Sequence, residues 1–183
     1  MPVTTLISEE EYLRLEDESE ERHEYVDGVL RLMAGTTEEH NEIVLNIATY
    51  LLPIARAKQC RVRTENVKLR LPFGSKRRYY YPDVTVLCAP RGEDKRIIEN
   101  PCFVVEVLSK STEQVDRIEK LETYQRIASL MQYVLVDQSK RKVEIYSRDE
   151  KGWRYELLEE GSFNVSCLNT VMTLEDVYAG LNV

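Results

Sequence analysis

Apolar residues in the first third of the chain recur at helical spacing, with one interruption. A Ser-x-x-Glu cap precedes an apolar stripe and predicts a helix over 9–18. A second helix is predicted from the capping box of Thr36 and Glu39 to about residue 57, with its end kinked or shortened by Pro53. Between the two helices, the stretch HEYVDGVLRLM predicts a β-hairpin, because Asp-Gly is a strong turn signal between alternating residues.

After the second helix the pattern changes to alternation, which is typical of strands. Residues 61–71 alternate between apolar and basic and predict a strand with one polar face. The stretches 80–88 and 102–108 contain few charges, as expected of strands near the middle of a sheet. A helix is then predicted over 112–130, followed by strands at 133–137, 142–147 and 153–158 and a last helical turn at 174–178. This order of elements predicts a mixed α/β fold built on one sheet.

Composition supports a single domain over residues 1–183. The chain is 43% hydrophobic and 31% charged, which is typical of a globular protein and excludes intrinsic disorder. It contains no repeat and no linker rich in Pro, Gly or Ser. The start of the sequence lacks the pattern of a signal peptide, and no apolar run approaches the ~20 residues needed to span a bilayer. We therefore expect a soluble, cytoplasmic protein with no membrane partner.

Cysteine and histidine usage limits the metals that the chain is expected to bind. Four cysteines are present, and none lies at zinc-finger spacing from another; we expect buried free thiols in a reducing compartment at Cys60, Cys88, Cys102 and Cys167. Two histidines are too few for HExxH or for a three-histidine zinc site. Carboxylates are plentiful, so a metal would be held by oxygen, which favours Mg²⁺ or Mn²⁺.

Charge is distributed unevenly along the chain. The net charge is −7, of which residues 1–27 contribute −8, whereas residues 56–78 carry +8. Such a basic stretch is able to contact phosphates, but it also suits a solvated hairpin whose Lys and Arg side chains prevent edge-to-edge aggregation. Charge alone does not decide between these interpretations. The candidate phosphate-contacting residues are Arg61, Arg63, Lys68, Arg70, Lys76, Arg77 and Arg78.

Three charged residues interrupt patterns that otherwise predict burial. Asp83 follows Pro82 in an apolar and aromatic stretch, and Glu106 is the one charge in PCFVVEVL. Lys120 falls at the rim of the apolar face of the predicted helix over 112–130. Taken singly, each has an ordinary structural explanation: an acid paired with Arg or capping a turn, and a lysine that extends its amine into solvent. Together, two carboxylates on neighbouring strands would form a site for one divalent ion, within reach of the lysine.

The motifs around these residues resemble a known family. The strings YPDVTV, PCFVVEVLSKST, DRIEKLETY and QYVLVD, in this order and spacing, resemble the Uma-type restriction endonuclease family of the PD-(D/E)XK nuclease superfamily. EYVDG and His40 match its N-terminal half, so the resemblance covers about residues 8–150. It implies the restriction-endonuclease-like fold, a central mixed β-sheet flanked by helices with an N-terminal helix and hairpin.

The resemblance also implies roles for individual residues. Asp83 and Glu106 correspond to the two metal-binding acids of the superfamily motif, and Glu24 to an early acid of the family. The motif lysine is absent, because Leu108 stands two residues after Glu106. Its role passes to Lys120 on the following helix, with Lys110 as a competing candidate.

The implied activity is hydrolysis of DNA by an endonuclease that depends on Mg²⁺, with Mn²⁺ as an alternative, and with DNA as the partner of the basic stretch. The alternative is a catalytically inactive module on the same fold that binds nucleic acid or protein. The chain has no P-loop, GxGxxG, GxSxG or HExxH motif, so the corresponding enzyme classes are not supported. The choice between DNA and RNA, and whether the chain forms a homodimer, stay open at this point.

Overall fold

The computed structural model describes residues 6–33 and 35–183 and confirms a mixed α/β fold. The central sheet has six strands in the order β11-β10-β9-β8-β6-β3. In chain order these are β3 (Arg61–Thr64), β6 (Val84–Leu87), β8 (Phe103–Leu108), β9 (Gln132–Asp137), β10 (Val143–Asp149) and β11 (Gly152–Leu158). Only the β8–β9 pair within this sheet is parallel.

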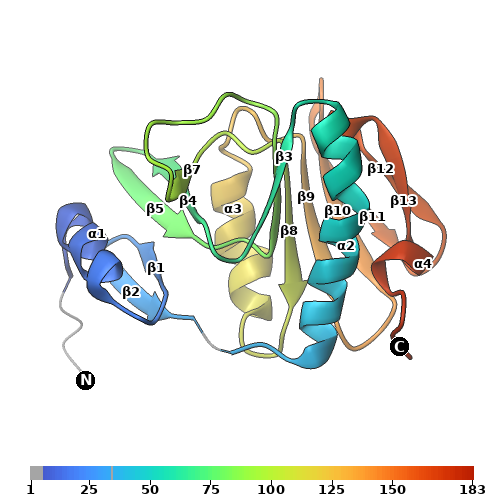
Figure 1. Cartoon of the computed structure of the whole chain (residues 1–183), viewed down its shortest axis with the longest axis horizontal. Helices are drawn as coiled ribbons and strands as arrows, with labels where there is room; N and C mark the ends of the chain where they lie inside the picture. The colour runs from blue at the N-terminus through green and yellow to red at the C-terminus, as the bar shows by residue number, and fades with distance from the viewer. Residues whose placement is uncertain (1–5, 34) are drawn as a thin grey trace.

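A second sheet lies on one side of the central one (Figure 1). It has five strands in the order β2-β1-β5-β4-β7, so one sheet is not enough to describe the fold, contrary to the sequence prediction. Its strands are β1 (His23–Val26), β2 (Val29–Leu32), β4 (Lys68–Phe73), β5 (Lys76–Tyr80) and β7 (Ile97–Ile98). The predicted helix and hairpin are both confirmed: α1 (Glu9–Glu18), which Ser8 caps, packs beside the β1–β2 hairpin.

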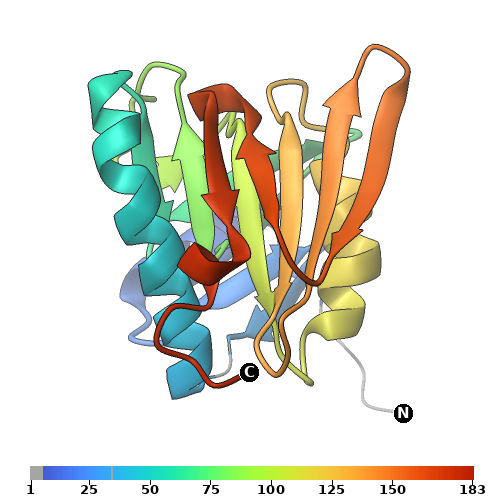
Figure 2. The same ribbon diagram turned by 90° about the vertical axis from the view of Figure 1, so that its right-hand side faces the viewer.

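Helices cover the two faces of the central sheet. The long helix α2 (Glu38–Ala57) lies on one face, together with the two-stranded sheet of β12 (Ser162–Val165) and β13 (Thr170–Thr173), the 3₁₀ turn η2 (Ser166–Leu168) and α4 (Leu174–Val177) (Figure 2). The opposite face is covered by a π-helical segment η1 (Val115–Lys120), which continues into α3 (Leu121–Tyr124), and by the second sheet.

The structure corrects several predicted boundaries. The strand predicted over 61–71 is two strands in different sheets, separated by a turn at 65–67. The stretch 80–88 is likewise divided, because Pro82 cannot continue the ladder between β5 and β6. The cap of α2 is Thr37, one residue later than predicted, and this helix runs through Pro53 to Ala57.

The helix predicted over 112–130 ends at Tyr124, and its buried face differs from the predicted one. Ile118, which ideal helical spacing from Val115 and Leu121 places on the apolar face, is 63% exposed, whereas Asp116 and Lys120 are buried. A π-helical turn contains more residues than an α-helical turn, so the phase of the pattern shifts along this segment. The deviation places polar residues on the face that packs against the sheet.

The expectation of four free thiols is wrong for this structure. Cys60 pairs with Cys88, and Cys102 with Cys167, as disulfides. Sequence separations of 28 and 65 residues give no local signal for either pair. None of the helices in 6–33 and 35–183 combines the length and the apolar character that a membrane-spanning segment requires.

Candidate active site

Asp83, which directly precedes β6, lies opposite Glu106 on β8. β6 and β8 are antiparallel, with Val84 paired to Val105, so the next pair in this register joins Asp83 and Glu106. The carboxylate of Asp83 also accepts a hydrogen bond from the backbone N–H of Val107, with 2.6 Å between Oδ2 and N. The sequence prediction that these two acids converge is therefore consistent with the geometry.

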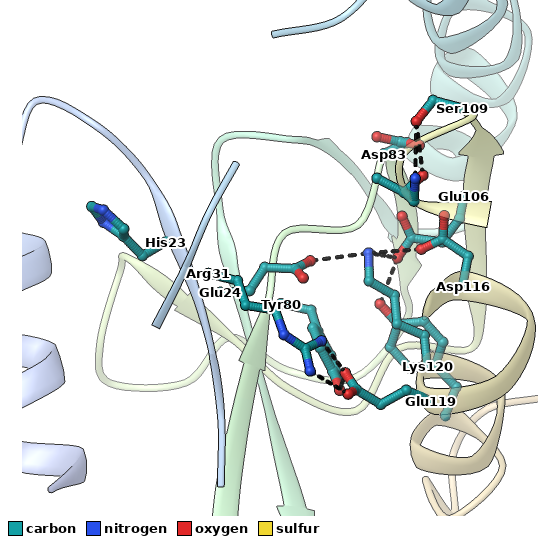
Figure 3. A network of polar contacts seen from close by, with 12 residues as sticks. His23, Glu24, Arg31, Tyr80, Asp83, Glu106, Ser109, Asp116, Glu119 and Lys120 are labelled. Carbon is teal, nitrogen blue, oxygen red and sulfur yellow. Dashed lines mark hydrogen bonds and ion pairs between the residues drawn. The ribbon is translucent and has the colours of Figure 1, made fainter. Parts of the chain in front are cut away.

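Lys120 lies at the junction of η1 and α3 and is buried, rather than at the rim of the helix face as the sequence suggested. Its Nζ lies 3.1 Å from Oε1 of Glu106 and 3.1 Å from Oδ1 of Asp116. The third partner is Glu24 on β1, whose Oε1 lies 3.0 Å from the same nitrogen. Figure 3 shows the ammonium group between carboxylates that come from three different elements.

This cluster carries more negative than positive charge in a largely dehydrated environment. Burial raises the pKa of Glu106 well above its ordinary value, and Asp116, Asp83 and Glu24 add to this effect, while Lys120 opposes it. Burial alone would lower the pKa of Lys120, but the surrounding carboxylates outweigh it and raise that pKa well above its ordinary value. The lysine is thus held in its charged form, and the acids around it favour an additional cation or proton.

Oxygen atoms remain free for such a cation. Within the described residues, Oδ1 of Asp83 and Oε2 of Glu106 take part in no hydrogen bond. The other oxygen of Glu106 accepts a 2.7 Å hydrogen bond from the hydroxyl of Tyr124, which fixes the side chain. Two carboxylates with one free oxygen each suit Mg²⁺, which binds few protein ligands and keeps several waters.

His40 on α2 contacts the same site from the opposite face of the sheet. Its Nε2 lies 3.2 Å from Oδ2 of Asp83. Burial acts to lower the pKa of His40, but the hydrogen bond and charge of Asp83 outweigh it, so the pKa is raised. Glu65, in the turn after β3, belongs to the same neighbourhood, because burial and the charge of Asp83 raise its pKa.

A second ion pair joins the N-terminal hairpin to η1. The guanidinium of Arg31 on β2 donates two hydrogen bonds to Glu119, with nitrogen–oxygen distances of 2.7 and 2.6 Å. The hydroxyl of Tyr80 donates a further one to the same carboxylate. Because Glu119 precedes Lys120, this contact holds the hairpin that carries Glu24 against the segment that carries the lysine (Figure 3).

The basic residues predicted to contact phosphate do not form one surface. Lys68 and Arg78 are buried, with exposures of 6% each. Three members of the set form ion pairs within the chain: Lys68 with Asp17, Arg70 with Glu99 and Arg78 with Asp27. The pair with Asp17 joins the second sheet to α1, and the other two pairs join strands of this sheet to one another, which charge counting along the sequence cannot reveal.

The remaining basic residues lie in two places. Lys76 and Arg77 are exposed at the turn between β4 and β5. Arg61 and Arg63 on the edge strand β3 line a hollow of about 360 Å³, together with Arg91 and Lys95.

Sequence reasoning missed several residues of the site. Asp116 reads as an ordinary solvent-facing acid four residues before Lys120, and only the π-helical turn buries it. Tyr124 is an aromatic residue at helical spacing, which predicts packing in the apolar core and does not reveal that its hydroxyl donates a hydrogen bond to Glu106. His40 was noted as a family match without a role, and its pairing with Asp83 required the packing of α2. Lys110, the competing lysine, is exposed in the turn after β8.

Comparisons with known proteins agree with this geometry. Residues 9–176 match the family Uma2, described as "Putative restriction endonuclease". Two proteins of Synechocystis sp. are similar in sequence. The uncharacterized protein slr1290 is 33% identical over 147 residues, which cover 80% of this chain and 76% of that protein. The uncharacterized protein sll1609 is 31% identical over 149 residues, which cover 79% and 82% respectively.

A solved structure shares the fold. The crystal structure of a putative nuclease belonging to DUF820 from Anabaena variabilis superimposes with a TM-score of 0.76. The match covers 94% of this chain and 98% of the other, at 19% sequence identity. The restriction-endonuclease-like fold implied by the sequence motifs is thereby confirmed. By its match over residues 9–176, the chain belongs to the Uma2 family, the family described as "Putative restriction endonuclease".

Proposed function

We propose that this protein is an endonuclease that hydrolyses DNA phosphodiester bonds with Mg²⁺ or Mn²⁺. The observation that carries the proposal is the position of Asp83, directly before β6, opposite Glu106 in the extended register of β6 and β8, with the ammonium of Lys120 3.1 Å from Glu106. The name of the family and that of the Anabaena protein point to the same class of reaction.

Asp83 and Glu106 would hold the ion through their free oxygens. Glu24 would act indirectly, because its carboxylate lies 3.0 Å from Nζ of Lys120 and helps to hold that ammonium group in place. When bound, the ion supplies positive charge for the phosphate and orients an attacking water. His40 holds Asp83 from the opposite side, and Tyr124 holds Glu106, so both ligands are fixed before the ion binds. Such positioning lowers the entropic cost of assembling the site.

Lys120 is suited to stabilise negative charge rather than to remove a proton. Its raised pKa keeps the amine protonated at neutral pH, so it cannot accept a proton from water in this state. A fixed ammonium beside the scissile phosphate would stabilise the charge that develops in the transition state. We therefore assign Lys120 this role and assign the motif position at Leu108 no catalytic role.

Cleavage of supercoiled plasmid and of a labelled duplex tests the proposal. Wild-type protein with Mg²⁺ or Mn²⁺ is expected to cleave, and chelator, Asp83→Asn or Glu106→Gln to abolish cleavage. Glu122→Gln is the matched control, since this carboxylate is exposed on α3 and pairs only with Arg126 among the described residues. Binding of duplex by wild type without any cleavage would instead favour the inactive module, and equal cleavage by all variants would refute the site.

A further inference from the structure

Four cysteines that are far apart in the sequence meet at one end of the central sheet. Cys60 precedes β3 and Cys88 follows β6, and they form the pair after Arg61 and Leu87 in the register, with Cα atoms 4.2 Å apart. Cys102 precedes β8, and Cys167 lies in η2. Figure 2 shows the turn between β12 and β13 near the end of the sheet at which α2 ends.

The sulfur atoms form one cluster rather than two separate pairs. Sγ of Cys88 lies 3.8 Å from Sγ of Cys102, although the two belong to different disulfides. The sulfurs of Cys88, Cys102 and Cys167 all lie within 4.8 Å of one another. The sulfur of Cys60 is outside this group of three and adjoins it through its bond to Cys88.

This spacing matches the coordination sphere of a tetrahedral metal. Zinc–thiolate bonds of about 2.3 Å place neighbouring sulfurs of a tetrahedral site about 3.8 Å apart. The unbonded pair, Cys88 and Cys102, is already at that separation. If the two S–S bonds are reduced, the sulfurs must move apart within each pair, and Sγ of Cys60, which lies outside the group of three, must turn toward Cys102 and Cys167 to enclose one ion.

The chemistry of the cluster selects the ion. Four thiolates with no nitrogen or oxygen ligand favour Zn²⁺ over hard ions such as Mg²⁺. A zinc tetrathiolate carries a charge of −2, and the adjacent strand supplies positive charge. Arg61, the residue after Cys60, lines one hollow together with Arg63 and Arg91, and Leu87 and Ala89, the two neighbours of Cys88, line it as well. Neighbouring cations favour deprotonated thiols.

We propose that the reduced protein binds one Zn²⁺ through Cys60, Cys88, Cys102 and Cys167, as a closed structural site separate from the carboxylates. The two disulfides are its oxidised, metal-free form. Reduction by a small thiol breaks both S–S bonds: four thiol molecules are oxidised to two disulfides, and the protein gains four electrons and four protons. Binding of Zn²⁺ then releases four protons to solvent.

The site would fasten the C-terminal segment to the sheet. Cys167 belongs to the β12–η2–β13 unit, whereas the other three cysteines lie at the ends of β3, β6 and β8. The unit packs on the sheet through buried side chains such as Phe163, Val165 and Leu168. A metal at this position would join four elements at one point, which two separate disulfides cannot do.

The full chain is reduced with a phosphine and desalted into metal-free buffer. It is then titrated with Co²⁺ and afterwards with Zn²⁺. Cobalt reports thiolate ligands by sulfur-to-metal charge-transfer absorption, and its visible bands report tetrahedral geometry. We expect saturation at one Co²⁺ per chain, displacement by Zn²⁺, and zinc in protein purified under reducing conditions. Cys88→Ser, at an exposed position, should weaken Co²⁺ binding more than about 100-fold. Mutation of residues that only hydrogen-bond to metal ligands already lowers metal affinity about 10–100-fold, and loss of a ligand itself should lower it further.

Asp83→Asn is the control, because it removes a carboxylate of the candidate active site and should leave the cobalt–thiolate spectrum unchanged. The wild-type spectrum tests the proposal even if a cysteine variant fails to fold. Four reactive thiols in the reduced protein without any cobalt–thiolate absorption would overturn the proposal. Absorption that persists in Cys88→Ser with unchanged affinity would overturn the four-ligand assignment. Neither result bears on cleavage, so the nuclease proposal is tested separately.

Discussion

The two faces of the strand β8 differ sharply, although both are buried. Phe103, Val105 and Val107 face α2 and the C-terminal unit and contact apolar side chains. On the other face, Glu106 stands between Val104 and Leu108 and faces the buried Lys120. Burying a charge costs stability, and replacing a buried ion pair with apolar residues is often neutral or stabilising. The charged face is therefore explained by function, and the apolar face by folding.

The largest expected effect comes from placing a charge on the wrong face. Val105→Glu introduces a carboxylate where all neighbours are apolar and no cation is positioned to pair with it among the residues described. We expect a loss of about 4 kcal/mol or more in the free energy of unfolding, because an unpaired buried charge is among the most destabilising changes. Chemical denaturation measures this. A variant with wild-type stability would show that the two faces are not distinct.

Lys120→Met tests the charged face through activity. Cleavage should fall by about 100-fold or more, as expected when a positioned charge stabiliser is removed. The matched control is Lys110→Met, which removes an exposed lysine and should keep wild-type rates. Single-turnover rates at saturating metal measure the effect.

A double variant sharpens the assignment of the lysine. Positions 106 and 108 share a face of β8, so Leu108→Lys combined with Lys120→Met should recover part of the activity. A collapse of activity in Lys110→Met alone would contradict the role given to Lys120.

The stability of the metal-free protein should depend on pH through Glu106. Because the pKa of Glu106 is raised in the folded state, its stabilising contribution is present at low pH and is lost as the pH rises through that value. With chelator present, melting of the wild type should fall as the pH rises. Glu106→Gln cannot ionise and should lack this part of the fall, with equal or higher melting temperature near neutral pH. A large drop in melting temperature for Glu106→Gln at every pH would indicate a purely structural ion pair.

The smallest effect concerns DNA binding. Lys76 and Arg77 are exposed at the β4–β5 turn, whereas Arg78 is held by Asp27 and Thr123. Lys76→Ala with Arg77→Ala should lower the slope of log affinity against log salt by about 0.9 for each phosphate that the protein no longer neutralises. The same double change at Arg61 and Arg63 tests the hollow on the edge strand. If neither pair changes the slope, the basic stretch is not the binding surface.

The sequence predicted the parts of the fold that depend on local chemistry. The helix over 9–18, the hairpin turning at Asp27 and the strands ending at Asp137 and Leu158 are confirmed, because caps, turns and alternation are local signals. The second sheet was missed, since pairing of β1 with β5 joins residues about fifty positions apart and leaves no periodic trace.

In the candidate site, too, residues with a local sequence signal could be predicted, and residues placed by long-range packing could not. Asp83 and Glu106 stood out because each is a charge in an otherwise buried strand, and the structure brings them together. Asp116 could not be found, because an ideal helical period places it in solvent and only the π-helical turn buries it. The cysteine cluster was missed for a related reason: its members meet through sheet register and packing, not through spacing.

The central claim is that Asp83 and Glu106 bind one divalent ion, and calorimetric titration tests it most directly. Mn²⁺ and Mg²⁺ are titrated into oxidised, chelator-treated wild type, Asp83→Asn and the control Glu122→Gln, so that the cysteines are closed as disulfides. The account predicts a saturating heat with about one site in wild type and in Glu122→Gln, and its loss in Asp83→Asn. Equal heats in all three proteins, or no heat in any of them, would contradict it.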